Sequence, residues 1–271
     1  MIGVCMDPDT AQPDGVPVVE LKDVHKRFGR QVVLDGIDLA LKPQQTTVIL
    51  GESGSGKSVI LKHIVRLLRP DKGEVRFRGT RIDDLPERQL APFRPEFGFL
   101  FQLGALFDSM TVIENIAFPI REHRRLSRVE IQTIVRQKLA MVGLRGIEDK
   151  FPAQLSGGQK KRVALARAIA IDPNVILYDE PTTGLDPPRS DVINELIIKL
   201  ERELGVTSVV VTHDMASAMK VADRIIMLYQ GKFIFDGTPE AIMRTTDPRV
   251  KHFVEGRADE EDLKSLSMKG G

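Results

Sequence analysis

Residues 51–58 read Gly-Glu-Ser-Gly-Ser-Gly-Lys-Ser, which is the spacing of a phosphate-binding loop. Glycines allow positive φ angles, so successive backbone N–H groups can point at phosphate oxygens. Lys57 would add a positive charge at the β- and γ-phosphates, and the Ser58 hydroxyl is placed to bind Mg²⁺. We therefore predict that the loop binds a nucleoside triphosphate together with Mg²⁺. The expected contacts are Gly51, Glu52, Ser53, Gly54, Ser55, Gly56, Lys57, Ser58 and Val59.

The segments on either side of this loop supply the context that the motif requires. Residues 46–50 are Thr-Thr-Val-Ile-Leu, which is typical of a buried strand. After the loop, apolar residues recur at helical spacing until Pro70. The positive end of that helix dipole would point at the phosphates. A simple glycine turn is the alternative interpretation, but it would not require a strand before it and a helix after it.

A second glycine-rich element, Leu-Ser-Gly-Gly-Gln, occupies residues 155–159 and opens another apolar-periodic helix. The start of such a helix offers free N–H groups to an anion, although Ser-Gly-Gly is also compatible with a plain entry into a core helix. If both glycine-rich elements serve one γ-phosphate, a two-fold head-to-tail dimer solves the geometry. We therefore expect each chain to give half of each site to a second copy of itself. The residues expected to contact the nucleotide of that second copy are Ser156, Gly157, Gly158 and Gln159.

Two carboxylates end an apolar strand at residues 175–180, Val-Ile-Leu-Tyr-Asp-Glu. In open α/β sheets, ligands collect at the carboxyl ends of the strands. We assign Asp179 to the Mg²⁺ shell and Glu180 to the attacking water as general base. Strand alternation would point the two side chains to opposite sides. Two solvated acids in a loop before Pro181 are the alternative, but that interpretation does not account for the strand.

Three more residues are candidates because of where they fall. His213 follows the apolar strand expected at residues 208–212, where a ring N–H could contact the γ-phosphate. Gln102 follows the strand expected at residues 97–101, where its amide could bridge Mg²⁺ and water. Phe28 could offer an aromatic face to adenine. Taken singly, His213 fits an ordinary turn histidine better than a ligand, whereas Phe28 fits a core position equally well.

Composition limits the classes of function. The chain has 271 residues and 42% apolar content, enough for one well-buried domain with a possible inserted subdomain. Its 39 Lys and Arg nearly balance 38 Asp and Glu, leaving a net charge of +1, so no global field would attract nucleic acid. We therefore expect no nucleic-acid partner. The single cysteine, Cys5, favours a reducing cytosolic location.

Membrane insertion and secretion are not expected either. No run approaches the ~18 to 20 apolar residues of a membrane-spanning helix. Residues 1–17 are rich in Asp, Pro and Gly, lack the order of a secretory signal, and are expected to form a disordered tail.

The order of predicted elements indicates one α/β nucleotide unit without an internal repeat. Strand patterns fill residues 18–50, and capping boxes at Thr111-x-x-Glu114 and Ser127-x-x-Glu130 open a helical insert that reaches residue 171. Parallel strands covered by helices follow, and the sequence beyond Pro248 is polar and charged, as in a tail. The later strands are expected at residues 175–178, 208–211 and 224–228, and the later helices at residues 190–204 and 215–222.

Taken together, these motifs resemble the ATPase subunit of ABC transporters over about residues 18–239. The corresponding motifs are Walker A at residues 51–58, the Q-loop at Gln102, the signature at 155–159, Walker B at 175–180, the D-loop at 184–186 and the switch histidine at His213. The resemblance implies a RecA-like P-loop NTPase core with an antiparallel β subdomain and a helical subdomain inserted at about residues 103–171. It also implies that Asp186 belongs to the nucleotide site, and that both sites of a homodimer hydrolyse ATP. The implied boundaries are 1–17 for the tail, 18–246 for the ATPase domain and 247–271 for a C-terminal extension.

A narrower resemblance follows the Q-loop. Residues 101–112, Phe-Gln-Leu-Gly-Ala-Leu-Phe-Asp-Ser-Met-Thr-Val, are similar to the Mla-type, MCE-linked phospholipid transporters, and residues 247–256 resemble the C-terminal extension of that group. This implies a multi-spanning permease, an MCE-domain lipid-binding subunit and a small STAS-domain protein as partners. It also implies that the chain lies peripherally on the cytoplasmic face of the bacterial inner membrane. The transporter would there maintain the lipid asymmetry of the outer membrane. Residues 104–107 would form an apolar notch for a permease helix, or else pack in the core.

Alternative functions remain within the same ATPase type. The transporter could carry another substrate, such as an amino acid or a metal, which the sequence of residues 101–115 argues against. A DNA-repair or translation ATPase typically needs a long coiled coil or two tandem units, and the chain has neither. The basic run at residues 121–128 is either a contact for lipid head groups or a solvated helix connection. The acidic stretch at 255–264 is expected to be a tail, and the resemblance implies that it could pack on the partner ATPase subunit or on the STAS-domain protein.

Overall fold

The computed structural model describes residues 16–257. The tail expected at residues 1–17, except for its last two residues, lies outside the described residues. The same is true of Cys5 and of the acidic stretch beyond residue 257.

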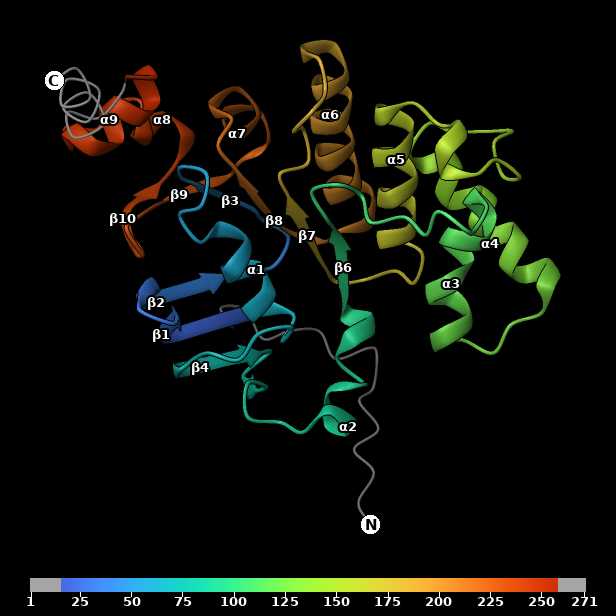
Figure 1. Ribbon diagram of the computed structural model, residues 1–271, viewed down its shortest axis with the longest axis horizontal. Coiled ribbons are helices and arrows are strands. Elements are labelled where there is room, and N and C mark those ends of the chain that lie inside the picture. Colours follow the sequence, from blue (N-terminus) through green and yellow to red (C-terminus); the bar gives the residue numbers. More distant parts are fainter. Residues whose placement is uncertain (1–15, 258–271) are drawn as a thin grey trace, which may run out of the picture.

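A six-stranded sheet forms the centre of the described structure (Figure 1). Its strand order is β10-β9-β3-β8-β7-β6, in which β10 is antiparallel and the other neighbours are parallel. The three strands in the middle are buried along their whole length, because helices or the second sheet cover both faces. The strands span β3 Thr46–Leu50, β6 Phe97–Leu100, β7 Val175–Asp179, β8 Thr207–Thr212, β9 Arg224–Tyr229 and β10 Lys232–Gly237.

The second sheet is antiparallel and smaller, with the strand order β2-β1-β4-β5. Helix α1 (Lys57–Ile64) lies between this sheet and the central one, and its residues Ile60 and Leu61 are fully buried. Burying an aliphatic side chain of this size stabilises the fold by roughly 1.5 to 3 kcal/mol. The helix that starts at the phosphate loop is therefore fixed from both sides. The strands span β1 Val19–Phe28, β2 Gln31–Leu41, β4 Lys72–Phe77 and β5 Thr80–Arg81.

A separate core lies on the opposite face of the central sheet. Because strand side chains alternate, Leu177 faces the α1 side, whereas Ile176 and Tyr178 face the helices of the other side. Helices α3, α4 and α5 gather beyond the β6 edge in Figure 1. The helices of this core are α3 Val112–His123, α4 Arg128–Met141, α5 Gly157–Ala168, α6 Pro187–Leu204 and α7 Met215–Val221.

Both predicted capping boxes are present. The Thr111 side chain accepts a hydrogen bond from the Glu114 N–H, and the Glu114 carboxylate accepts one from the Thr111 N–H at 2.8 Å. Ser127 and Glu130 repeat this arrangement at the start of α4. The chain therefore enters the helical region at the positions that its local sequence specifies.

The segment after Pro248, expected to be a tail, is helical as far as Glu255. Helix α9 (Pro248–Glu255) begins at Asp247, which caps the Arg249 N–H, and ends at the left-handed Gly256. The expectation was wrong because a short helix with one buried side chain, Val250, has a polar sequence. The other elements not anticipated are β5, β10, α2 Glu87–Leu90, α8 Pro239–Ile242 and the 3₁₀ turns Arg94–Glu96 and Pro152–Gln154. Within residues 16–257, no helix has the length and apolar character needed to span a membrane.

Candidate active site

The phosphate loop connects β3 to α1, and its backbone requires glycine. Gly56 is the N-cap of α1 with φ 107°, and a Cβ at this position would lie 2.8 Å from Val33 Cγ1. Within the described residues, the Ser55 hydroxyl is buried without a hydrogen-bond partner. A buried hydroxyl without a partner is costly, so an arriving phosphate oxygen would satisfy it. The loop therefore fits the triphosphate predicted for it.

Lys57 is buried at the start of α1. Its ammonium donates to the Gly51 and Glu52 carbonyl oxygens, each at 2.8 Å, and lies 3.6 Å from Glu180 Oε1. Burial lowers the pKa of Lys57, while the Glu180 carboxylate opposes this shift. The ammonium is thus held beside the loop, where its positive charge can attract an anion.

Ser58 and Asp179 form the other side of the site. The Ser58 hydroxyl donates to Asp179 Oδ1 at 2.7 Å. Burial raises the pKa of the Asp179 carboxyl, although the Ser58 hydrogen bond opposes this shift. A hydroxyl and a carboxylate are the oxygen ligands that Mg²⁺ prefers, and a cation would compensate the burial of the charge. Two of the three predicted metal ligands therefore lie together.

The third predicted metal ligand, Gln102, lies after β6 with an exposed side chain. Its amide has no hydrogen bond to Ser58 or Asp179 in the described part of the chain. β6 and β7 are parallel neighbours, and Leu100 pairs with Tyr178, so Gln102 follows the same sheet edge as Asp179.

Glu180 is the first residue after β7 and adopts a left-handed backbone with φ 47°. The strand alternation expected for the two carboxylates therefore does not apply to it. Its carboxylate lies 2.9 Å from His213 Nδ1 and accepts hydrogen bonds from the hydroxyls of Thr183 at 3.1 Å and Thr212 at 3.4 Å. Glu180 and His213, predicted separately as catalytic residues, are thus in direct contact, and the two threonines were not anticipated from the sequence.

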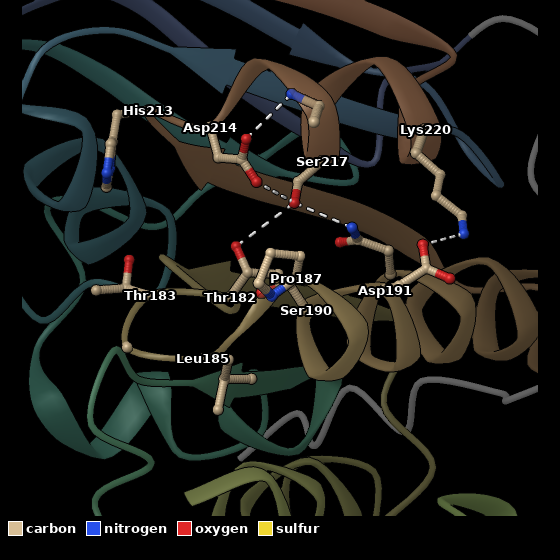
Figure 2. Close-up of a pocket in the computed structure, with 13 residues that line it drawn as sticks. Thr182, Thr183, Leu185, Pro187, Ser190, Asp191, His213, Asp214, Ser217 and Lys220 are labelled. Atoms are coloured by element: carbon tan, nitrogen blue, oxygen red, sulfur yellow. Dashed lines mark hydrogen bonds and ion pairs between the residues drawn. The ribbon is translucent and has the colours of Figure 1, made fainter.

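His213 also borders a groove of about 680 Å³ between the D-loop and the start of α7. Figure 2 shows its ring directed toward Thr183, which lines the same groove. Deeper in, the Ser217 hydroxyl donates to Asp214 Oδ2 at 2.6 Å and accepts from Asn194 Nδ2 at 3.0 Å. These bonds tie α6 to α7.

The signature element starts helix α5 away from the phosphate loop. Ser156 caps this helix, accepting from the Gln159 N–H at 3.3 Å, while Gln159 Oε1 accepts from the Ser156 N–H at 3.0 Å. A Cβ at Gly157 would lie 3.7 Å from the Leu185 side chain, which places the signature beside the D-loop. Figure 1 shows β7 and β8 between α5 and α1. Within one chain, therefore, the structure does not bring the signature to the phosphate loop.

Two further predicted residues lie at the surface. Asp186 caps α6, accepting from the Arg189 N–H at 2.9 Å. Phe28 lies at the tip of the β1–β2 hairpin and is 47% exposed, with Lys26 Nζ 5.6 Å from its ring centroid. The alternative of a core position for Phe28 is thereby wrong, and its ring is available for stacking.

Sequence comparison then decides the family. The ABC transporter family profile matches residues 34–183, which is more than half of the chain. The chain belongs to the ABC transporter family. The intermembrane phospholipid transport system ATP-binding protein MlaF of Haemophilus influenzae is 43% identical over 242 residues, covering 89% of this chain and 92% of that protein. The probable ribonucleotide transport ATP-binding protein mkl of Mycobacterium leprae is 41% identical over 249 residues, 92% of this chain and 72% of that protein.

Solved structures agree with this assignment. The dimeric post-hydrolysis structure of the ATP-binding cassette MJ0796, bound to ADP and Pi, matches with a TM-score of 0.76 at 36% identity over 82% of this chain and 98% of that one. The predicted ABC ATPase fold is therefore confirmed, and this member of the ABC transporter family binds and hydrolyses ATP.

One residue that contacts the site of this ABC ATPase was not identified from the sequence. Lys161, on α5, is buried, and its ammonium donates to the Gln102 carbonyl oxygen at 2.6 Å and to the Glu180 carbonyl oxygen at 3.1 Å. Its position among Lys and Arg residues at the start of a helix suggests a solvated face. A sign available in the sequence was its place on the same helical face as Leu165 and Ala168.

Proposed function

We propose that the chain is the ATP-hydrolysing subunit of a membrane ABC transporter that moves phospholipid between the inner and outer membranes and so maintains outer-membrane lipid asymmetry. The observation that carries this proposal is the 43% identity to an MlaF protein over 92% of its length. The resemblance of residues 101–112, around the Q-loop, to the same group agrees with it. Ribonucleotide transport is the second candidate, because the similarity to mkl is almost as high.

In this proposal, the phosphate loop and Lys57 bind the β- and γ-phosphates, and Phe28 stacks on adenine. Ser58 and Asp179, joined by Gln102, would hold Mg²⁺, which when bound neutralises charge on the phosphates. The Lys57 ammonium, which donates to the Gly51 and Glu52 carbonyl oxygens, would exchange these acceptors for phosphate oxygens.

Glu180 takes the proton of the attacking water. Its carboxylate is oriented by the hydroxyls of Thr183 and Thr212. His213 Nδ1 lies 2.9 Å from the carboxylate, and in the presence of ATP the His213 ring would contact the γ-phosphate. A positioned general base of this kind contributes roughly 10²- to 10⁴-fold to a rate.

The site is completed by a second copy of the chain. The signature residues Ser156 to Gln159 lie away from their own phosphate loop and are partly or fully exposed, so they would reach the nucleotide of the partner together with Asp186. The dimeric state of the related cassette MJ0796 supports this arrangement. Two equivalent sites would result, each hydrolysing ATP.

The permease would dock on an apolar groove of about 410 Å³ between β6, the loop after Gln102, α3 and α5. Its lining includes Phe107 and Phe118, whose ring centroids are 5.1 Å apart, and Leu103 close by is 91% exposed. Arg167 holds the loop in place by donating to the Gly104 and Ala105 carbonyl oxygens, each at 2.8 Å. An apolar groove beside Gln102 suits an inserted permease helix that reports on the nucleotide site.

The remaining assignments follow from the likeness to the Mla group. We assign residues 18–246 to the ATPase domain, about 103–171 to its helical subdomain, and 247–271 to a C-terminal extension that includes α9. An MCE-domain subunit and a small STAS-domain protein would complete the complex. The chain would be held peripherally on the cytoplasmic face of the inner membrane through the permease.

Purification of the complex from its native membrane tests the proposal. The chain should be recovered with a multi-spanning permease, and the reconstituted complex should move phospholipid between membranes in an ATP-dependent manner that Glu180→Gln abolishes. ATP-dependent ribonucleotide uptake by the same complex would favour the second candidate. Recovery with DNA or ribosomes in place of a permease would refute both.

A further inference from the structure

Lys161 is a buried cation that the catalytic scheme does not use. It lies in the second turn of α5, 7% exposed, and within the described residues its ammonium has no carboxylate partner within ion-pair distance. Its two hydrogen bonds go to backbone carbonyl oxygens, those of Gln102 and Glu180. Burying a charge is unfavourable unless the group is hydrogen-bonded, so these two contacts are what holds the ammonium inside.

The two carbonyl groups belong to segments far apart in the sequence. Gln102 follows β6, Glu180 follows β7, and Lys161 comes from the helix that begins with the signature. Burial lowers the pKa of Lys161, while the nearby charges of Glu180 and Asp179 oppose this shift. One side chain therefore joins the Q-loop, the end of Walker B and the signature helix at a single point.

The contact acts on a backbone that needs support. Glu180 has a left-handed φ of 47°, a conformation that non-glycine residues hold only when their surroundings fix it. Its N–H donates to the Val211 carbonyl oxygen at 2.9 Å, and its own carbonyl oxygen accepts from Lys161. Both peptide groups flanking the carboxylate are thus fixed, which keeps the side chain directed at His213.

We propose that Lys161 is a positioning residue that keeps Glu180 and the Gln102 loop in register with the signature helix. The proposal rests on the proposed function, in which Glu180 acts in its own chain while the signature serves the partner's nucleotide. Lys161 then links the two sites of the dimer, because a shift of α5 at one site moves the backbone of the hydrolytic carboxylate at the other.

Steady-state ATPase kinetics of the full-length chain test the proposal. Lys161→Met keeps the length of the side chain and removes the donor, and it should lower kcat at least tenfold while KM for ATP stays within about twofold. Lys161→Arg, which keeps donors at this position, should recover most of the rate. Lys160→Met is the matched control, because its ammonium makes no hydrogen bond or ion pair in the described structure, and its kcat should stay within twofold of wild type.

A second measurement separates positioning from general damage to the fold. In a Glu180→Gln background, where turnover is stopped, Lys161→Met should still bind ATP in the monomer but should lower the ATP-dependent dimer fraction several-fold. A kcat for Lys161→Met within twofold of wild type would refute the proposal. Equal losses in Lys161→Met and Lys161→Arg, or a loss of monomer ATP binding, would also refute it.

Failure of this inference and failure of the proposed function are distinguishable. Glu180→Gln alone tests the catalytic assignment, because it should stop hydrolysis whatever Lys161 does. If Glu180→Gln is inactive and Lys161→Met is normal, the positioning role is wrong and the catalytic assignment stands.

Discussion

Replacing Gly56 with alanine should destabilise the protein through backbone strain and through close contact with Val33. At φ 107° an alanine adopts a strained backbone, which costs about 1 to 3 kcal/mol. Its Cβ would also lie 2.8 Å from Val33 Cγ1 and 3.1 Å from the Val33 carbonyl oxygen, so Val33 in strand β2 must shift. Overpacking of this kind costs about 1 to 3 kcal/mol more. The reduced freedom of the unfolded chain returns about 0.4 to 1 kcal/mol.

The net expectation for Gly56→Ala is a loss of roughly 1 to 6 kcal/mol in the free energy of unfolding, summed from these terms. Gly54→Ala is the matched control, because Gly54 also has a positive φ, of 82°, but a Cβ there would meet nothing within 4 Å. It should therefore show only the backbone strain. Urea unfolding of the nucleotide-free protein, followed by circular dichroism, measures both losses from their midpoints and slopes.

A double-mutant cycle isolates the contact. Val33→Ala removes Cγ1, the nearest atom. The loss of stability in the double mutant should therefore be at least about 1 kcal/mol smaller than the sum of the losses in the two single mutants, a coupling energy within the usual range for residues in contact. The steric account of the loop is refuted if Gly56→Ala lowers the free energy of unfolding no more than Gly54→Ala does. It is also refuted if the effects of Gly56→Ala and Val33→Ala simply add.

Three further predictions concern ATP and Mg²⁺. Glu180→Gln should keep ATP binding while phosphate release falls about 10²- to 10⁴-fold, and undiminished release would remove Glu180 as general base. Lys57→Ala should weaken nucleotide binding by about 10- to 100-fold in a titration, since it removes a charged hydrogen-bond donor worth about 1.5 to 3 kcal/mol; normal affinity would exclude the loop from the site. The Mg²⁺ concentration for half-maximal ATPase activity should rise as pH falls, because the protonated Asp179 carboxyl does not bind cations. This rise should begin above the pH at which an ordinary aspartate titrates, because burial raises the pKa of Asp179. Asp179→Asn should need more Mg²⁺ at every pH and lose this pH-dependent part, and an identical pH profile in both proteins would contradict the assignment.

Local chemistry made the phosphate loop, the strand ends and the capping boxes predictable. A glycine pattern between a strand and a helix, or a Thr-x-x-Glu before an apolar run, acts within a few residues, so no tertiary information is needed. The strands expected before Gln102, Asp179 and His213 are also present, and the sheet places the three residues at one edge.

Features that depend on tertiary contacts were not predictable in this way. Whether Phe28 was core or surface depended on the end of a hairpin, and the direction of Glu180 depended on a backbone angle fixed by Val211 and Lys161. Lys161 itself looked like a solvated charge, because its two acceptors are backbone groups that leave no mark in the sequence. Helix α9 was mistaken for a tail because it contributes Val250 as its one buried side chain.

The alternation of β7 between two cores limits how this chain can vary in length. A deletion of one residue inside the strand would exchange Leu177 and Tyr178 between the cores and move Asp179 away from Ser58. An added residue would do the same in the opposite direction. Insertions and deletions should therefore be tolerated in the surface connections, such as that between α3 and α4, and should be excluded from the strands that end at the nucleotide. A scan of single-residue deletions along the gene would reveal these strands as continuous intolerant blocks.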